Sequence, residues 1–372
     1  MHEGSRIRSI MRKTVVTLGL AFVFLVVLGM DVRAQVTEVT LVPGPDSSAI
    51  LAATGMTDQQ LQDVVKAELN RLFQMSNAAG FLQRFGDAQS FTSKGLGVDY
   101  ASEATYVEVG GAASFALGMD KSYQPGNALP VQVQSVGMNA SLMAGVSLMP
   151  FGIPVMLFGN GMYVPTQRYG DMSGSLDNWG IHAQLRLFGP SRKTSSRGML
   201  VRWGGIAITT GYDYSHMSLR LNRDIRSNFS IPNSVTQGVN VDVTGSASGT
   251  AVFGVDMTTK SIPLEITTSV RLLTLLTAYG GMGFDFNVGG SSVMNLDLDA
   301  RLLGHVPGPT NVDMGSAHIH ATIPPVGPSA AKIRGILGLQ INLFMVRLFT
   351  QVNIANTTPT MASLAAGLRV AY

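Results

Sequence analysis

The chain has 372 residues, of which 13% are charged, about half the share that is usual in soluble globular proteins. It contains no cysteine, which excludes disulfides, thiolate metal sites and a lipidated amino-terminal Cys. The formal net charge is +3 and no Lys/Arg cluster is interleaved with aromatic residues, so no nucleic-acid partner is expected.

Residues 1–34 have the pattern of a secretory signal peptide. Basic residues precede an apolar run from Val15 to Met30, and Ala34 is a small residue next to the expected cleavage site. The mature chain is expected to start near Gln35, and Met11 is an alternative start of translation. An uncleaved inner-membrane anchor is the competing interpretation, but the apolar run is shorter than the roughly 20 residues of a spanning helix.

Residues 35–96 form the expected amino-terminal region, a linker followed by helices. Residues 57–75 have helical periodicity with Thr57 as the expected N-cap, and a second short helix is expected from Asn77 to Phe85. This region is expected to form either a plug inside a barrel or a small periplasmic element. The apolar stripe of the first helix consists of Leu61, Val64, Val65, Leu69, Leu72 and Phe73.

From residue 97 to the end, the hydrophobic pattern has a period of two. Between Val136 and Leu148, apolar residues occupy every even position and mostly small or polar residues occupy the odd ones, which gives a strand one apolar and one polar face. About 14 such strands are expected, with a range of 12 to 16. Their ranges are 100–118, 131–149, 154–165, 177–189, 198–212, 214–223, 237–257, 262–273, 275–288, 292–303, 314–323, 332–343, 345–355 and 362–372.

A soluble β-sandwich whose sheets have one solvent-exposed face would show the same alternation. The segments are long for globular strands, and tight reversals such as 150–154 and 344–345 contrast with longer polar connections such as 119–130. Aromatic residues recur near segment ends, as in interfacial girdles. The predicted fold is therefore all-β, a closed antiparallel transmembrane β-barrel. The aromatic residues are Trp179, Phe188, Trp203, Tyr212, Tyr214 and Phe344.

The last residues resemble the terminal strand of bacterial outer-membrane β-barrel proteins. Apolar residues stand at every second position and the final one is aromatic, and this set is Leu364, Ala366, Leu368, Val370 and Tyr372. The resemblance implies location in the outer membrane, contact with its lipid, and recognition by the barrel-assembly machinery. It covers the architecture of roughly residues 100–372 and no specific family.

Charged and polar residues on the hydrophilic strand faces are the candidates for lining the barrel interior. Both signs of charge occur, so the sequence favours an interior of Arg–carboxylate pairs at least as much as a conducting lumen. His318 and His320 share a strand face but lack a third metal ligand, and Asp297 and Asp299 lie near Arg301, so pairing is the simpler interpretation. The candidates are Glu108, His182, Gln184, Arg186, Arg220, Glu265, Arg271, Asp285, Asp297, Asp299, Arg301, His318, His320, Arg347 and Gln351.

No phosphate-binding glycine loop, nucleophile elbow or HExxH motif is present, so neither an enzyme nor a cofactor is expected. The leading hypothesis is a channel or transporter for small or hydrophobic solutes. A barrel with an amino-terminal plug is similar in outline to the FadL-like transporters. Residues 76–80 resemble their hatch motif only weakly. A non-conducting structural or surface-interaction barrel is the alternative, and a periplasmic β-rich binding protein is the third possibility.

Overall fold

The computed structural model describes most of the chain beyond the predicted signal peptide. Thr57 and Gln60 exchange two hydrogen bonds of 2.8 and 3.2 Å, which is the reciprocal pattern of a capping box at the N-cap that the sequence predicts. The remainder of the predicted helix 57–75 lies almost entirely outside the described residues. These are 38–45, 57, 59–60, 63, 78–101, 106–119, 133–188, 201–236, 239–273, 275–305, 311–355, 357 and 360–372.

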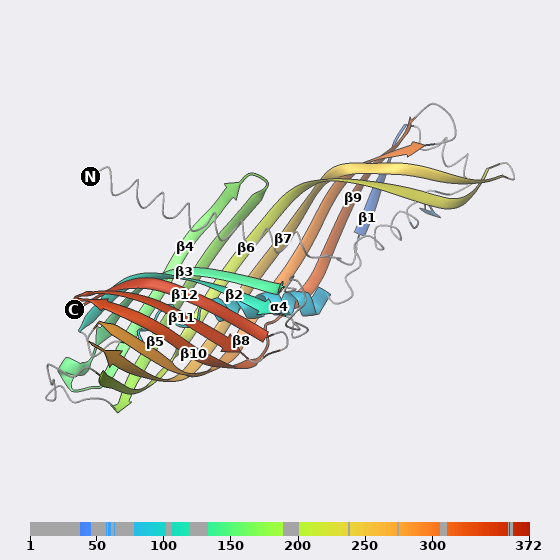
Figure 1. Ribbon diagram of the computed structural model, residues 1–372. Coiled ribbons are helices and arrows are strands. Elements are labelled where there is room, and N and C mark those ends of the chain that lie inside the picture. The colour runs from blue at the N-terminus through green and yellow to red at the C-terminus, as the bar shows by residue number, and fades with distance from the viewer. Residues whose placement is uncertain are drawn as a thin grey trace, which may run out of the picture.

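Antiparallel strands and one long helix make up the described fold (Figure 1). Among the described residues, no helix has both the length and the hydropathy to cross a membrane. The elements in chain order are β1 (Glu38–Pro43), α4 (Ala78–Thr92), β2 (Val107–Met119), β3 (Val133–Ser147), η1 (Met149–Phe151), β4 (Val155–Tyr169), β5 (Met172–Phe188), β6 (Val201–Thr236), β7 (Val239–Leu272), β8 (Leu276–His305), β9 (Asn311–Val326), β10 (Ala331–Leu343), β11 (Val346–Ala355) and β12 (Thr360–Ala371).

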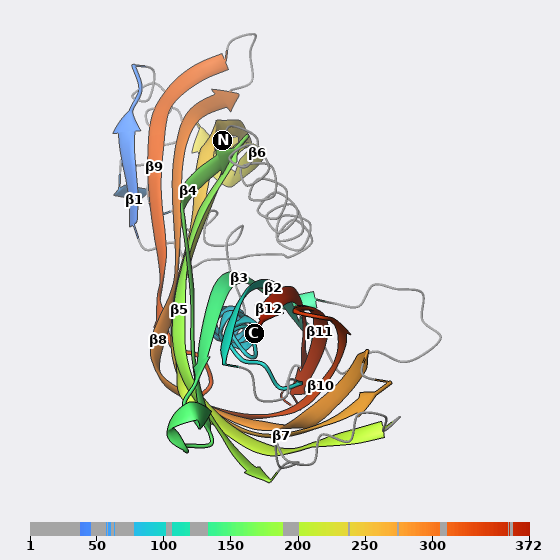
Figure 2. The same ribbon diagram turned by 90° about the vertical axis from the view of Figure 1, so that its left-hand side faces the viewer.

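The strands form one 12-stranded antiparallel sheet that closes on itself. Its order is β1-β9-β8-β10-β11-β12-β2-β3-β4-β5-β6-β7, and β7 also pairs with β8. The ring therefore runs from β8 through β10, β11, β12, β2, β3, β4, β5 and β6 to β7 and back to β8 (Figure 2). β10 pairs with the first part of β8, whereas β9 pairs with its last part and carries β1 on its other edge. The predicted closed β-barrel is confirmed.

The strand number is lower than the predicted 14 because three pairs of predicted strands are continuous. Strands 198–212 and 214–223 are both part of β6, and β7 and β8 likewise each contain two predicted strands, which leaves 11. β1, which the sequence analysis assigned to the linker, brings the total to 12. The gaps between the predicted segments, such as residues 258–261 of β7, do not end the strands.

In the ring, the apolar faces point outward and the polar faces point inward. Along β10, exposed and buried residues alternate almost without exception. Ile333, Leu337 and Ile341 are exposed on the outside, whereas Lys332 and Arg334 are buried on the inside. We call this apolar outer surface of the ring the oily wall. Lipid cannot hydrogen-bond the backbone, and a closed ring leaves no unpaired edge. The oily wall therefore matches a bilayer.

Aromatic side chains mark both borders of the oily wall. Phe188, Trp203 and Tyr372 are exposed near the end of the ring where the chain terminates. At the other border, Trp179 lies 5.4 Å from Tyr212 and 5.8 Å from Tyr214 between ring centroids. About ten residues of β6 separate the two borders, which is the length of a strand that crosses a bilayer at a tilt.

An arginine in the middle of this wall should therefore interfere with insertion. Leu337 lies at the centre of β10 and is 65% exposed, so we expect Leu337→Arg to cost about 2–4 kcal/mol of folding free energy in lipid. Urea titration of the heat-modifiable folded band in liposomes measures this cost. Ser316→Arg is the control, because Ser316 is exposed on β9 outside the ring. Equal tolerance of both arginines would contradict a membrane position for β10.

Three ring strands continue far beyond the oily wall. We call this part the extension. It comprises residues 215–236 of β6, 239–259 of β7 and 290–305 of β8, together with β9 and β1 (Figure 1). From Lys260 back to its first residue, Val239, β7 covers roughly 70 Å at about 3.3 Å per residue.

The polarity of the sheet reverses at the level where the extension begins. On the outer face of β7, exposed Ile262 and Leu264 give way to Lys260 and Asp256. On the inner face the change is opposite, from Ser261 and Glu265 to apolar side chains. Buried apolar residues of the inner face form one cluster with the start of α4, namely Leu82, Ala251, Met294, Leu296, Leu298, Ala300, Ala321 and Ile323.

A β-bulge in β8 lies at the same level. Lys260 pairs with Gly289 and Ser261 with Asn287, so that Val288 is an extra residue. Gly290 has a φ of 136°, and a Cβ there would lie 2.4 Å from the backbone oxygen of Thr258, so only glycine fits. The extra residue exchanges the two faces of β8, so odd positions face inward before the bulge and even positions after it.

Candidate functional site

The interior of the ring is the candidate site, and α4 occupies it (Figure 2). Every residue from Phe85 to Ala101 is buried, although this segment belongs to neither face of the sheet. Gly137 of β3 permits a close approach, because a Cβ there would lie 2.6 Å from the carbonyl carbon and oxygen of Ala88. The helix is longer than the predicted 77–85, because its second half packs against the wall of the barrel.

Apolar contacts fix one side of α4. Phe85 packs with Val136, Met217 and Met257 of the surrounding strands. One turn further on, Ala88 and Phe91 belong to a second cluster with Ala116, Ala355 and Met361. The interior wall is therefore apolar where this side of the helix lies against it.

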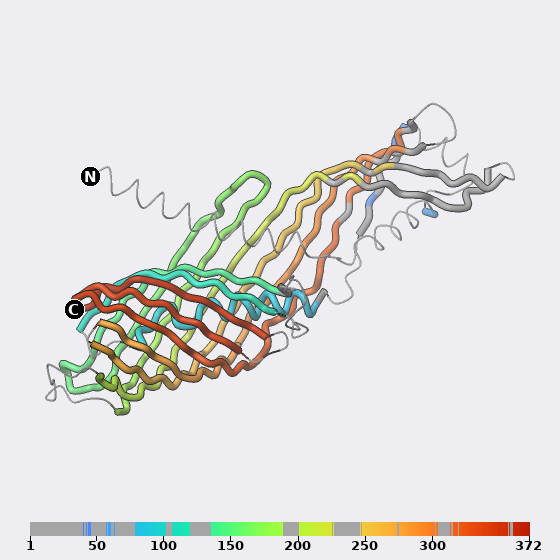
Figure 3. Tube along the Cα trace, viewed as in Figure 1, coloured from blue at the N-terminus to red at the C-terminus, as the bar shows by residue number. Residues whose placement is uncertain are grey.

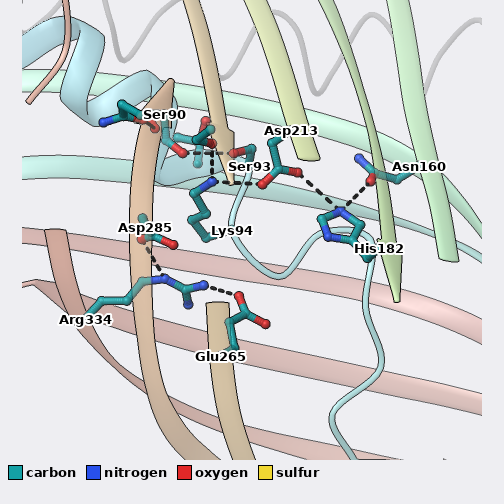
Figure 4. Close-up of polar contacts among 12 residues, drawn as sticks. Ser90, Ser93, Lys94, Asn160, His182, Asp213, Glu265, Asp285 and Arg334 are labelled. Carbon is teal, nitrogen blue, oxygen red and sulfur yellow. Dashed lines mark hydrogen bonds and ion pairs between the residues drawn. The ribbon is translucent and has the colours of Figure 1, made fainter. Parts of the chain in front are cut away.

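Lys94, directly after α4, forms the first of several buried polar clusters (Figure 4). Its Nζ lies 2.8 Å from Asp213 Oδ2 of β6 and 2.5 Å from Ser261 Oγ of β7. Asp213 Oδ1 is 3.3 Å from His182 Nε2 of β5, which in turn is 3.2 Å from Asn160 Oδ1 of β4. We call α4 and the segment that follows it, residues 78–101, the plug. One lysine of the plug is thus connected to four consecutive strands.

Arg334 of β10 is the centre of a second cluster (Figure 4). Its guanidinium pairs with Glu265 of β7, and its Nε donates to Asp285 Oδ2 of β8 at 2.9 Å. Nη1 donates to Asn353 Oδ1 of β11 at 2.9 Å. Tyr100 of the plug segment donates to the other oxygen of Glu265 at 2.6 Å, so this cluster also connects plug and wall.

Asp99 is the centre of a third cluster, near the end of the ring where the chain terminates. It lies 3.1 Å from Arg347 of β11 and 2.8 Å from Arg369 of β12. Arg347 also pairs with Glu108 of β2 at 3.1 Å. Arg369 lies 3.8 Å from the ring centroid of Phe349, a cation–π distance.

A fourth contact holds α4 at the opposite end of the ring. Asp87 pairs with Lys332 of β10 at 2.7 Å, and it accepts hydrogen bonds from the backbone N and the Oγ of Ser329, both at 2.7 Å. Asp87, Lys94 and Asp99 thus join the plug to the wall at successive heights. The segment from α4 to Asp99 is joined by ion pairs to β6, β10, β11 and β12.

The structure brings together one part of the predicted interior set and separates the rest. Glu108, His182, Gln184, Glu265, Asp285, Arg347 and Gln351 are buried inside the ring. Arg186 and Arg271 are half-buried close to the end with the tight turns. Arg220, Asp297, Asp299, Arg301, His318 and His320 instead lie on the outer face of the extension, because the polarity of the sheet is reversed there.

Pairs across neighbouring strands organise this outer face. His318 Nδ1 lies 2.5 Å from Asp299, and His320 Nδ1 lies 2.5 Å from Asp297. Arg301 donates to Asp313 at 2.7 Å, and this hydrogen bond lowers the pKa of the Asp313 carboxyl. Within the part of the chain that the structure describes, no group of three His, Asp or Glu side chains is arranged to hold a metal ion.

Several interior residues were missed in the sequence. Lys332 and Arg334 stand at inward positions of a cleanly alternating strand, a signal that could have found them. Arg369 stands between Leu368 and Val370 in the terminal strand and offered the same signal. The charges of the plug segment, Asp87, Lys94 and Asp99, gave none, because only the fold shows that this segment is inside the ring. The predicted assembly residues Leu364, Ala366, Leu368, Val370 and Tyr372 are exposed on the outer face of the last strand.

Solved structures with a similar fold include, by their titles, an autotransporter translocator domain, a toluene transporter and a FadL homologue. The translocator domain of the autotransporter NalP from Neisseria meningitidis is 13% identical, with a TM-score of 0.31 and coverage of 80% of this chain and 98% of that chain. The toluene transporter TbuX from Ralstonia pickettii is 7% identical, with a TM-score of 0.24 and coverage of 73% and 90%. A FadL homologue from Pseudomonas aeruginosa is 8% identical, with a TM-score of 0.23 and coverage of 77% and 97%.

No curated protein matches the chain by sequence. A family model described as Lsa36-like matches residues 34–372, which is the whole barrel together with the amino-terminal region. The chain belongs to the Lsa36-like family.

Proposed function

We propose that the protein is a sealed outer-membrane barrel that presents the extension as an interaction surface and does not conduct solutes. The observation that carries this proposal is the continuous burial of residues 85–101 inside the ring. Of the two leading hypotheses from the sequence, a channel and a non-conducting surface barrel, this observation favours the second.

The charges of the interior support a permanent plug. Opening a passage along α4 would separate Lys94 from Asp213 and Asp99 from Arg347 and Arg369. Breaking a buried ion pair on one side leaves an uncompensated charge, which costs about 3–5 kcal/mol. Because several such pairs join the plug to different strands, a displaced plug is a rare state at equilibrium.

The outer membrane is the compartment that fits the exterior. The oily wall with two aromatic borders matches a bilayer, and the predicted signal peptide and the aromatic carboxyl terminus match the export and assembly of outer-membrane barrels. The polar outer face of the extension cannot lie in lipid, so this part projects into water.

Purified full-length protein in planar bilayers is the direct test. We expect no discrete conductance steps under conditions in which a porin of known conductance gives them, and no uptake of a hydrophobic probe into proteoliposomes. The heat-modifiable gel shift of the same preparation shows that the inserted protein is folded. Regular steps, or probe uptake above that of empty liposomes, would contradict a sealed barrel and favour the channel hypothesis.

A further inference from the structure

The two ends of the ring differ in their connections. At one end, tight turns at 149–154, 273–275 and 344–345 join neighbouring strands, and Tyr372 lies there as well. Only the β5–β6 connection at this end is longer. At the other end, β6 and β7 run far beyond the oily wall, as part of the extension, before they turn at 237–238, and the connection 120–132 is longer. Short turns face the periplasm in outer-membrane barrels and longer loops face outward, so the extension lies outside the cell.

The plug runs through the ring from the outer end to the periplasmic end. Near its start, Gln83 and Asp87 contact Ser329, which lies between β9 and β10 at the outer end. After the plug, the backbone N–H groups of Tyr106 and Val107 donate to the Tyr372 carbonyl at the periplasmic end, where β2 begins. The start of α4 therefore lies at the outer end.

β1 confirms this direction from an independent contact. All six residues from Glu38 to Pro43 pair with β9, so that Thr40 stands opposite His318 and Val42 opposite Ser316. β1 lies in the extension, far from the C-terminus (Figure 3). Residue 43 and residue 78 are thus both at the outer end, on the same side of the plug.

We infer that the barrel carries its own amino-terminal region across the outer membrane, so that β1 is at the cell surface and completes the edge of the extension. A signal peptide delivers the amino terminus to the periplasm before the barrel exists. β1 therefore has to cross the membrane, and the route that leaves α4 in the lumen is the interior of the closing ring. This inference rests on the proposed outer-membrane location and on the orientation of the extension derived above.

Single cysteines test it, because the native chain has none. Thr40→Cys places a thiol on the exposed face of β1, Ser316→Cys on the neighbouring β9, and Phe151→Cys in a tight turn where the side chain is 79% exposed. Each full-length variant is treated on intact cells with a membrane-impermeant maleimide and again after lysis. We expect Thr40→Cys and Ser316→Cys to be labelled equally before and after lysis, and Phe151→Cys to gain at least tenfold on lysis.

The outcomes separate the inference from the proposed function. Labelling of Ser316→Cys but not of Thr40→Cys on intact cells would overturn the inference and leave a surface-exposed extension. Protection of both, or labelling of Phe151→Cys on intact cells, would reverse the orientation and overturn the inference, while the sealed barrel is tested separately. The planar-bilayer result does not depend on any of these variants. An epitope inserted after Asp46 repeats the Thr40 test without replacing a residue of β1.

Discussion

Replacing Arg334 with methionine should lower the free energy of unfolding by about 3–5 kcal/mol, the usual cost of removing one partner of a buried ion pair. Arg334 is 1% exposed and is bonded to both Glu265 and Asp285, so its loss leaves two carboxylates facing each other without a cation. Urea titration of the folded, heat-modifiable band in detergent or lipid measures the change.

Two controls show whether the charge is the cause. Arg301→Met removes an ion pair on the exposed outer face of the extension and should leave the urea midpoint unchanged. The triple variant Arg334→Met, Glu265→Gln, Asp285→Asn removes all three charges and should recover most of the stability. If the single and triple variants are equally unstable, the loss reflects packing of the side chain and not unpaired carboxylates.

Gly137→Ala should displace the plug. The added Cβ would lie within 2.7 Å of the carbonyl group of Ala88 and the backbone nitrogen of Gln89, and backbone atoms of a packed helix cannot yield as a flexible side chain can. Overpacking of this kind costs about 1–3 kcal/mol. Because the strain falls on the contact between α4 and β3, we expect bursts of conductance in planar bilayers where the native protein is silent.

Gly159→Ala is the matched control, since the nearest atom to its Cβ is the Gly180 carbonyl oxygen at 3.9 Å. Both variants carry the same chemical change in adjacent strands, so a general effect of replacing glycine in a sheet would appear in both. A silent Gly137→Ala protein that is as stable as Gly159→Ala would show that α4 is not seated against β3.

The sequence predicts the barrel well because its strands in the ring are amphipathic. Alternation places β10, β11 and β12 within two residues of their observed ends, and the aromatic residues at strand ends lie at both borders of the oily wall. The interior ion pairs were also anticipated as a class, and His182, Glu265, Asp285 and Arg347 are buried there.

The extension could not be predicted in the same way. Alternation reports that a strand has one apolar and one polar face, but it does not tell which of them is inside. Asp297 and His320 therefore look identical in the sequence to Glu265 and Arg347, although they lie on opposite faces of the sheet. β1 gave no periodic signal because it has only six residues and ends at Pro43.

The reversal of polarity has a mechanical consequence. It occurs within unbroken strands, and the ladder between β6 and β7 continues across that level from Thr209 to Met217 with a short gap in pairing. Among the described residues of β6, β7 and β8, no hinge of single-chain backbone separates the membrane-embedded wall from the projecting sheet. The extension is thus continuous with the barrel and holds a bound partner at a constant distance from the lipid. A pulling force at its tip is transmitted through the hydrogen-bonded strands directly to the barrel.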